Sequence, residues 1–268
     1  MSAPDSTPGT AGELAGLRAV VTGGSNGIGL AIVEAFAAAG ATVLALDLDP
    51  SAAPDGVRAL ACDVRDRASV TDAVDAAAEE MGGLDLLVNN AGISAVGTVE
   101  DLKDEDWHRV LDVNVVGMAR ASAAALPHLR RSASPAIVNL CSIGALNGLP
   151  QRVLYNASKG AVLSLTYAMA TDHVHEGVRV NAVSPGTVHT GFVDRMLSRF
   201  PDPEKEKAAL DARQATGRMV TPAEVAHAVV YLASPRAGST TGTALEVDGG
   251  VTHLRARAVQ ASGTGAGS

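Results

Sequence analysis

The sequence predicts an α/β fold built on one doubly wound parallel sheet of about seven strands, with helices on both faces. Short apolar segments alternate with helix-length segments along most of the chain. The short segments are apolar throughout instead of alternating with polar residues, which is typical of parallel strands buried on both faces. The chain has 268 residues, of which 47% are hydrophobic, and shows no internal repeat, so one domain is expected.

The elements of the first half follow from apolar runs and their end signals. Residues 18–22 are an apolar run that leads into glycine-rich sequence, which indicates a buried strand. Residues 29–39 have the apolar spacing of a helix closed by Gly40, and residues 42–47 and 59–63 are the next two strands. Residues 69–81 predict a helix with Ser69 as its N-cap and Asp72 three residues later. Residues 84–88 are the fourth expected strand.

Two long helices dominate the second half, over residues 104–129 and 155–175, with a strand at 137–142 between them. Residues 178–183 and 245–247 are the last two strands. A helix over 221–233 begins Thr-Pro, where proline suits the first helical position. We expect the domain to span 14–255, and the low-complexity ends, 1–13 and 256–268, to be disordered tails.

Composition excludes several classes of function. The formal net charge of −8 and the pI near 5.3 argue against a nucleic-acid or anionic-membrane surface, because phosphates would be repelled. No apolar run approaches the roughly 18–20 residues that span a bilayer, and the first residues do not form a signal peptide. Cys62 and Cys141 lie on separate apolar segments and need not pair. These features predict a cytoplasmic protein with free thiols.

A glycine-rich turn joins the first strand to the first helix. It reads Thr22-Gly23-Gly24-Ser25-Asn26-Gly27-Ile28-Gly29. Glycines there let the backbone approach a pyrophosphate, and the helix N-terminus offers free N–H groups and a partial positive charge. A simple tight turn is the alternative interpretation, but a strand before it and a helix after it are the context that a dinucleotide site requires.

Asp47 ends the second strand, 18 residues beyond Gly29. An acid at that place accepts hydrogen bonds from the adenosine ribose hydroxyls and repels a 2′-phosphate. No Lys or Arg lies in the glycine-rich turn or next to Asp47. The sequence therefore favours NAD over NADP. The alternative interpretation is that Asp47 only caps the turn that follows the strand.

Tyr155 and Lys159 are four residues apart and share one face of an expected helix. An ammonium beside a phenol stabilises the phenolate. Ser142 can join this pair through the fold, and the three could then hold a substrate oxygen and exchange a proton with it, as alcohol–ketone interconversion requires. Taken alone, the same spacing also occurs in ordinary surface helices.

The chain resembles the short-chain dehydrogenases/reductases from about residue 14 to residue 254, because several motifs occur in the order found in that family. Thr22 to Gly29 fits the family's TGxxxGxG, and Asn89 to Gly92 fits its NNAG after the fourth strand. The remaining matches are Asn114, Ser142, Tyr155, Lys159, Pro185-Gly186 and Thr190. The resemblance implies a single-domain Rossmann fold and an NAD(P)-dependent oxidoreductase.

The resemblance also implies catalytic roles. Tyr155 would exchange the proton with the substrate hydroxyl, and Lys159 would stabilise its phenolate and hold the nicotinamide ribose. Ser142 would hydrogen-bond the substrate oxygen as charge develops there. Asn114 would support a water that links Lys159 to solvent.

The implied cofactor site runs along the carboxyl ends of the strands. Asp63 and Val64 would contact adenine, Asn90 to Gly92 would line the trough, and Val188 and Thr190 would touch the carboxamide. Hydride would pass directly between substrate carbon and nicotinamide, so no metal is needed. The full implied set is Gly23, Ser25, Asn26, Gly27, Ile28, Gly29, Asp47, Asp63, Val64, Asn90, Ala91, Gly92, Tyr155, Lys159, Pro185, Gly186, Val188 and Thr190.

Arg152 is the main candidate for substrate contact, because it lies three residues before Tyr155. Its guanidinium could clamp a carboxylate in a two-point geometry, with Gln151 adding a hydrogen bond. A surface or subunit-contact arginine is the alternative. A second clamp is available from one of three arginines in or after the variable segment 192–220, namely Arg195, Arg213 and Arg218.

Sequence around these arginines narrows the resemblance. Arg152 to Tyr155, Pro185 to Val188 and Arg213 to Arg218 are similar to the type-2 3-hydroxybutyrate dehydrogenases. The same stretches and the ending 247–255 are similar to bacterial dehydrogenases of L-fucose and of 2-keto-3-deoxy sugar acids. The resemblance therefore implies a polar substrate, in most of these cases a carboxylate.

Two other kinds of site receive little support. His173 and His175 are two residues apart, on different sides of a helix, and no metal site is expected from them or from His189 and His227. Cys141 adjoins Ser142 but has no partner for a protease-like dyad, so it is interpreted as a core residue.

The sequence thus predicts an NAD-dependent dehydrogenase that oxidises a secondary alcohol, on a hydroxy acid, sugar or sugar acid. The alternative enzyme is an NADPH-dependent 3-oxoacyl-(acyl-carrier-protein) reductase, against which Asp47 and the acidic net charge both count. The alternative of another class is a non-catalytic dinucleotide-sensing protein, which typically lacks the Tyr or the Lys that this chain keeps.

A homotetramer formed through the two long helices is expected from the resemblance. These helices carry small residues that permit close packing, Ala119, Ala121, Ala161 and Ala168. Packing of the same residues inside one subunit is the alternative.

Overall fold

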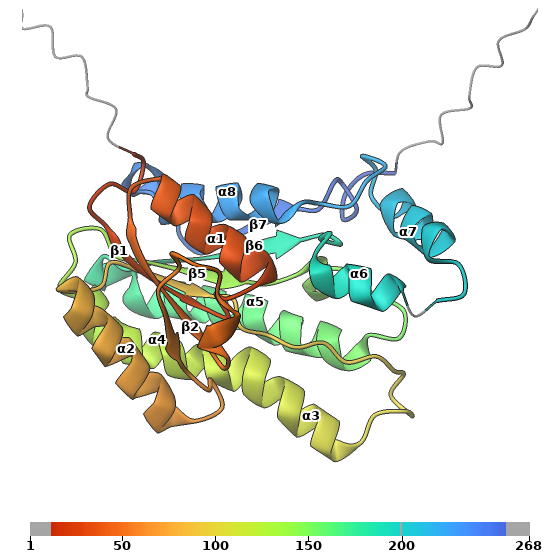
Figure 1. The fold of residues 1–268 in the computed structure, drawn as a ribbon, viewed down its shortest axis with the longest axis horizontal. Helices are drawn as coiled ribbons and strands as arrows, with labels where there is room; N and C mark the ends of the chain where they lie inside the picture. Colours follow the sequence, from red (N-terminus) through yellow and green to blue (C-terminus); the bar gives the residue numbers. More distant parts are fainter. Residues whose placement is uncertain (1–11, 199, 256–268) are drawn as a thin grey trace, which may run out of the picture.

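The sheet of this protein has seven parallel strands in the order β3-β2-β1-β4-β5-β6-β7, as seen in a computed structural model that describes residues 12–198 and 200–255 (Figure 1). The strands are β1 Arg18–Thr22, β2 Thr42–Asp47, β3 Ala59–Ala61, β4 Leu86–Asn89, β5 Ala136–Leu140, β6 Arg179–Pro185 and β7 Ala244–Val247. The α/β Rossmann-like fold predicted from the sequence is confirmed.

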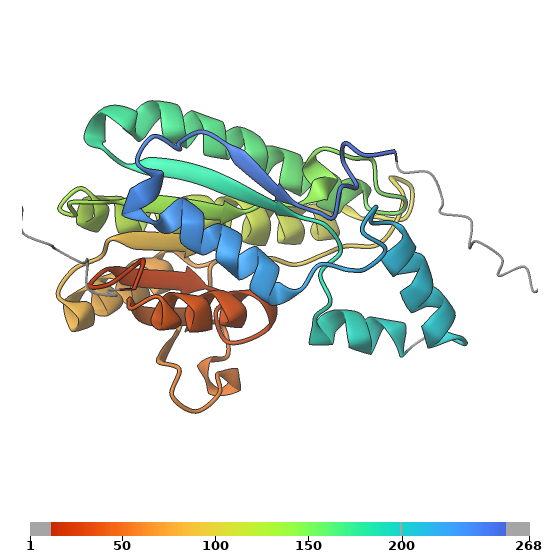
Figure 2. The same cartoon turned by 90° about the horizontal axis from the view of Figure 1, so that it is seen from above.

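Helices cover both faces of this sheet (Figures 1 and 2). Helices α1 and α8 lie on one face, where Ile32 and Phe36 pack with Val225 and Val229. Helices α2, α4 and α5 lie on the other, where Val74 and Leu129 belong to one buried cluster. The helix bounds are α1 Gly27–Ala38, α2 Arg67–Met81, α3 Asp104–Leu111, α4 Gly117–Leu129, α5 Val153–His173, α6 Gly191–Leu197, α7 Pro203–Ala212 and α8 Pro222–Ala233.

The strand order reverses between β1 and β4, which places a crevice at their carboxyl ends. The chain runs from β1 to β2 and β3 on one side, then returns to add β4 on the other side of β1. Thr22 and Asn89 are the last paired residues of these two strands. In open α/β sheets, ligands bind at this switch point. Helices α6 and α7 stand beyond the same edge of the sheet (Figure 1).

Helix α2 begins earlier than the sequence predicted. Its N-cap is Asp66, whose carboxylate accepts hydrogen bonds from the Ala68 and Ser69 N–H groups. The Ser69 hydroxyl instead accepts a hydrogen bond from the Asp63 N–H at 3.0 Å. The expected capping role of Ser69 is therefore wrong, because the chain leaves the strand at Ala61 and Asp66 reaches the free N–H groups first.

The helix expected over 104–129 is interrupted. A π-helical turn, Asp112–Val116, separates α3 from α4 and carries the fully buried Asn114. Such turns are rare and frequently mark functional sites. No local sequence signal announces it, since it depends on contacts of Asn114 with other parts of the chain.

The predicted tails fall outside the described residues, apart from Gly12 and Glu13. Leu14, where the domain was expected to begin, is fully buried, and its N–H bonds to the Ala39 carbonyl at 2.9 Å. Within the part of the chain that the structure describes, no helix is long and apolar enough to cross a membrane.

Candidate active site

The glycine-rich turn after β1 is shaped to receive a pyrophosphate. Helix α1 begins at Gly27, its N-cap Asn26 makes no side-chain cap, and no acidic residue lies in its first turn. Its first N–H groups therefore face the crevice with their partial positive charge. A Cβ on Gly29 would overlap the Gly23 backbone oxygen, so the turn closes only on glycine. The Ser25 hydroxyl is buried and finds no partner among the described residues, which suits a ligand oxygen.

A second turn, after β4, is tied to the first. The Asn90 side chain donates to the carbonyls of Thr22 and Gly23, at 3.1 and 2.9 Å. The Thr22 hydroxyl in turn accepts hydrogen bonds from the Asn90 and Ala91 N–H groups. These reciprocal hydrogen bonds join the turn after β4 to the glycine-rich turn after β1. The Asn90 side chain thus holds the trough together, a role that the motif did not specify.

Asp47 lies at the end of β2, beside the glycine-rich turn. Its Oδ2 accepts a hydrogen bond from the Ser25 N–H at 3.0 Å, and its Oδ1 accepts one from the Asp49 N–H at 3.3 Å. A carboxylate has about four acceptor sites, so two bonds leave room for ribose hydroxyls. Asp47 also caps the turn that follows β2, as its alternative interpretation held.

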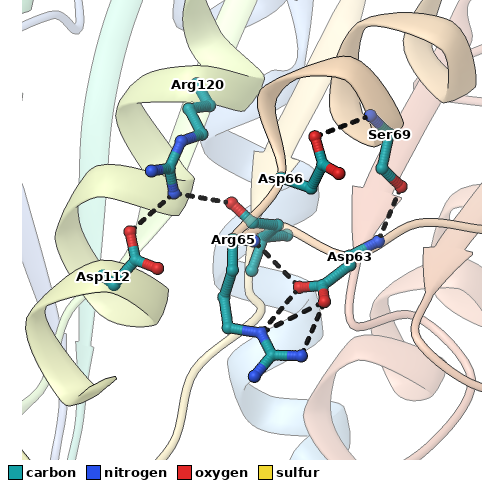
Figure 3. Close-up of polar contacts among 7 residues, drawn as sticks. Asp63, Arg65, Asp66, Ser69, Asp112 and Arg120 are labelled. Carbon is teal, nitrogen blue, oxygen red and sulfur yellow. Dashed lines mark hydrogen bonds and ion pairs between the residues drawn. The ribbon is translucent and has the colours of Figure 1, made fainter. Parts of the chain in front are cut away.

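Asp63 and Val64 are predicted to contact adenine, and Figure 3 shows the polar contacts around Asp63. The Asp63 carboxylate pairs with the Arg65 guanidinium, with 2.6 Å between Oδ2 and Nη2. Hydrogen bonds from Arg65 hold the pKa of the Asp63 carboxyl below its ordinary value, although burial opposes them. This pair is a feature that the sequence reasoning missed.

The segment after β6 carries the residues that are predicted to contact the nicotinamide end of the cofactor. The Gly186 N–H bonds to the Val247 carbonyl at 3.0 Å, and Gln214 and Asp248 lie so close that a Cβ on Gly186 would contact both. Val188, nearly buried, forms an isolated bridge with Val220. Thr190 is the N-cap residue of α6, and its methyl group would lie 4.0 Å from a Cβ on Gly27. The start of α6 therefore lies beside the glycine-rich turn.

Tyr155 and Ser142 come from different elements that pack directly. Ser142 caps a 3₁₀ turn, Ile143–Ala145, by accepting a hydrogen bond from the Gly144 N–H at 3.0 Å. That leaves the Ser142 O–H free to donate. A Cβ on Gly144 would lie 3.3 Å from the Tyr155 ring, so this turn rests against the tyrosine. Within the described chain, no hydrogen bond engages the Tyr155 hydroxyl.

Lys159 lies one turn along α5 from Tyr155. Its ammonium is 5.8 Å from the centre of the Tyr155 ring and donates to the Leu140 carbonyl at 2.7 Å. The residue is only 6% exposed, and this carbonyl is its one hydrogen-bond acceptor among the described residues. A buried ammonium needs further acceptors, which the hydroxyls of a ribose can supply.

Asn114 is fixed by three hydrogen bonds. Its Oδ1 accepts from the Ile93 N–H at 2.8 Å, and its Nδ2 donates to the Ile93 carbonyl at 2.9 Å and to the Ser158 hydroxyl at 3.0 Å. The Ser158 hydroxyl donates to the Tyr155 carbonyl at 2.8 Å. Sequence reasoning missed Ser158, although a polar residue on the buried face between Tyr155 and Lys159 was a usable signal.

A buried polar chain supports the floor of the site. Asn89 donates to Ser122 and Asn139, and Asn139 donates to Thr166, all at about 3 Å. These residues come from β4, α4, β5 and α5, so the network joins the sheet to two helices. Buried networks of this kind rigidify a structure, although the Asn89 Oδ1 is buried without a hydrogen-bond partner among the described residues.

Arg152 and Gln151 precede α5. Gln151 is the one non-glycine residue of the described chain with a positive φ, 55°, and its carbonyl accepts a hydrogen bond from the Gly97 N–H. Such strain clusters at functional sites. Burial lowers the pKa of the Arg152 guanidinium, and the positive charge of Arg213 lowers it further. Neither guanidinium has a carboxylate partner in the described structure.

The other two candidate arginines lie elsewhere. Arg218 makes a two-point ion pair with Glu224, at 2.6 and 2.9 Å, and is thereby engaged at the start of α8. Arg195 is exposed on α6. Of the three, Arg213 is the one whose charge lowers the pKa of the Arg152 guanidinium.

Metal ligands and reactive thiols add nothing to this site. No group of three or more His, Cys, Asp or Glu that could hold a metal ion occurs in the residues that the structure describes. Cys62 and Cys141 are both buried and free, and burial raises the pKa of the Cys62 thiol to about 11. Cys141 belongs to a buried apolar cluster, as expected.

Comparison with known proteins gives this site a family. The family described as Enoyl-(Acyl carrier protein) reductase matches residues 23–252. The chain is 41% identical over 245 residues to 2-(S)-hydroxypropyl-CoM dehydrogenase 3 of Xanthobacter autotrophicus, covering 87% of this chain and 96% of that protein. It is 37% identical to Dehydrogenase/reductase SDR family member 6 of Danio rerio, covering 89% of this chain and 98% of that protein.

A solved structure agrees. Ligand-free aldohexose dehydrogenase of Thermoplasma acidophilum superposes with a TM-score of 0.87 at 35% identity, over 93% of this chain and 99% of that one. With a family match over most of its length and relatives well above 30% identity, the chain belongs to the short-chain dehydrogenase/reductase family of NAD(P)-dependent oxidoreductases.

Proposed function

We propose that this protein is an NAD-dependent dehydrogenase that oxidises a secondary alcohol carrying an anionic group, such as a hydroxy acid or a sugar acid, to its ketone. The bound cofactor supplies the nicotinamide carbon that accepts the hydride. The rest of the chemistry belongs to side chains of this chain.

The Ser142 hydroxyl would donate a hydrogen bond to the reacting oxygen, and Tyr155 would take the hydroxyl proton. Lys159, buried one helical turn away, stabilises negative charge on the tyrosine oxygen. The proton would leave along Lys159 toward Asn114. In the reverse direction the same groups return it, since catalysis runs both ways.

Support for an anionic substrate comes from Arg152 at the start of α5, which has no carboxylate partner among the described residues, and the same is true of Arg213. Burial lowers the pKa of the Arg152 guanidinium, and the positive charge of Arg213 lowers it further. An anionic group between them would relieve both penalties and accept charge-assisted hydrogen bonds. Arg152 lies three residues before Tyr155 at the start of α5, so the anion would sit near the reacting carbon.

The preference for NAD rests on Asp47. Its carboxylate stands at the end of β2 against the glycine-rich turn and is held there by the Ser25 N–H. A 2′-phosphate would meet this negative charge with no lysine or arginine in the turn to offset it.

A homotetramer is also proposed. Ala121 packs inside the subunit core, which is the alternative that the sequence left open for it. Val116, Tyr167 and Ala168 are exposed, leaving an apolar outer face near α4 and on α5. Sedimentation velocity at low protein concentration tests this, and a monomer at every concentration would contradict it.

The test of function is NADH formation from NAD with hydroxy acids and sugar acids, each compared with its uncharged methyl ester, and with free aldoses and simple secondary alcohols. The acids should be preferred, and Arg152→Ala or Arg213→Ala should lower kcat/KM for the acid by about 10²-fold while sparing the ester. Arg218→Ala is the matched control, because its guanidinium is already paired with Glu224.

Two outcomes would count against the proposal. Equal turnover of acid and ester, indifferent to both arginine substitutions, would remove the anionic substrate class and leave a dehydrogenase. Binding of NADH without turnover of any alcohol would instead favour the non-catalytic dinucleotide-sensing protein.

A further inference from the structure

Arg120 on α4 connects two parts of the site that are far apart in sequence (Figure 3). Its Nη1 donates to the Val64 carbonyl at 3.1 Å and to the Asp112 carboxylate at 2.7 Å. Val64 belongs to the adenine end of the crevice, and Asp112 is the first residue of the π-helical turn that carries Asn114. A single nitrogen of Arg120 thus joins the loop at the predicted adenine site to the π-helical turn that carries Asn114.

The surroundings partly bury this bridge. The Arg120 side chain is 17% exposed and the Asp112 side chain 36%, so the pair is partly screened from water. A Cβ on Gly117 would lie 3.0 Å from the Val64 side chain, which means that the first residue of α4 touches the same loop. The loop that bears Asp63 and Val64 therefore rests on the helix that continues the π-helical turn.

The remaining groups of the cluster serve other purposes. Arg65 is engaged with Asp63, and Asp66 caps α2. Among the side chains labelled in Figure 3, Arg120 is the one that hydrogen-bonds both to the loop bearing Asp63 and Val64 and to Asp112. Carbonyls that accept from a guanidinium are held more strongly than those facing water.

We propose that Arg120 is a positioning residue that couples the adenine end of the cofactor site to the turn carrying Asn114. The inference rests on the proposed placement of the dinucleotide along the crevice. Binding of the adenine end would order the Val64 loop, and Arg120 would transmit that order to Asp112. The coupling is reciprocal, so a change at Asp112 must alter affinity at the adenine end.

The test uses ADP-ribose, which carries the adenine end of the cofactor and no nicotinamide, with affinity measured by titration calorimetry. Arg120→Met should weaken binding about threefold to tenfold, and Arg120→Lys should restore most of it, because an ammonium has enough donors for both acceptors. Arg130→Met is the matched control. It removes the same charge just beyond α4, where Arg130 pairs with Glu176, and should leave affinity unchanged.

Asp112→Ala gives the decisive result. A purely electrostatic effect of removing this carboxylate would strengthen binding of the anionic ligand. The coupling predicts the opposite, a weakening smaller than that of Arg120→Met, and no further loss when the two substitutions are combined.

Each contrary outcome is distinct. A lower melting temperature for Arg120→Met with unchanged ADP-ribose affinity would reduce Arg120 to a structural residue. Tighter binding or no change in Asp112→Ala would remove the link to the π-helical turn. Failure of the unaltered protein to bind ADP-ribose would instead overturn the cofactor placement itself, independently of Arg120.

Discussion

The Asn114 amide donates to the Ser158 hydroxyl at 3.0 Å, which joins the π-helical turn to the helix that carries Tyr155 and Lys159. The Ser158 hydroxyl in turn donates a hydrogen bond to the Tyr155 carbonyl. The turn that carries Asn114 is thus hydrogen-bonded to the helix that carries two of the predicted catalytic residues, Tyr155 and Lys159. Substitution of Asn114 or Ser158 should therefore affect this connection.

Asn114→Leu should be strongly destabilising. A leucine leaves the Ile93 N–H and carbonyl without their partner in a buried place, which should lower the free energy of unfolding by about 2–4 kcal/mol. Ser158→Ala removes only one contact of Asn114 and should lower it by about 1 kcal/mol. Urea denaturation measures both, and equal small losses would show that the Ile93 contacts contribute little.

Gly29→Ala should abolish dinucleotide binding. Its Cβ would overlap the Gly23 oxygen and crowd the Asn90 side chain, so the turn and the contact between the two loops must both shift. Gly238→Ala is the control, since its backbone is helical at φ −56° and its nearest neighbour would be an ordinary 3.5 Å away. Fluorescence titration with NADH measures the effect, and unaltered affinity in Gly29→Ala would contradict the pyrophosphate assignment.

Asp47→Asn should relax the choice between NAD and NADP. The asparagine keeps an oxygen for the Ser25 N–H but loses the charge that opposes a 2′-phosphate. The ratio of kcat/KM for NAD to that for NADP should fall at least about tenfold. Asp49→Asn, two residues away, is the charge-matched control. Unchanged selectivity in Asp47→Asn would refute the role given to Asp47.

Stability should depend on pH through Asp85, which is 4% exposed. Burial raises the pKa of the Asp85 carboxyl, but hydrogen bonds from Arg18 and Ser132 outweigh it and lower the pKa from 3.8. A lowered folded pKa means stabilisation that is fully present above about pH 4 and lost as pH falls through the folded value.

Asp85→Asn measures this contribution directly. It should lower the free energy of unfolding by about 2 kcal/mol at pH 7, since Arg18 loses its charged partner. The gap between the two proteins should narrow as the pH is lowered below about 4. A gap that stays constant from neutral to acid pH would show that the carboxylate charge does not matter.

Much of the fold could be predicted because its signals are local. The strands are apolar runs, and the glycine-rich turn sits between a strand and a helix, so their ends were placed within a few residues. The carboxyl ends of parallel strands share an edge, so the segments that follow β1, β4 and β5, where the predicted motifs lie, come to the same edge of the sheet.

What the sequence could not supply depends on contacts between distant segments. The π-helical turn at Asp112–Val116 reflects bonds from Asn114 to Ile93 and Ser158. The sequence left Arg195, Arg213 and Arg218 as candidates for a second contact with the substrate. The ion pair of Arg218 with Glu224 removes Arg218 from these candidates, and Arg213 is the one whose charge affects Arg152. The same holds for the cap of α2, where Asp66 takes the role predicted for Ser69.

The central proposal is that Tyr155 takes the hydroxyl proton when a secondary alcohol is oxidised and NAD accepts the hydride. We would measure NADH formation with the best acid substrate for the unaltered protein and for Tyr155→Phe, with the melting temperature as the check on folding. We expect NADH formation to fall by about 10²- to 10⁴-fold in Tyr155→Phe at an unchanged melting temperature. Equal rates in the two proteins would contradict it.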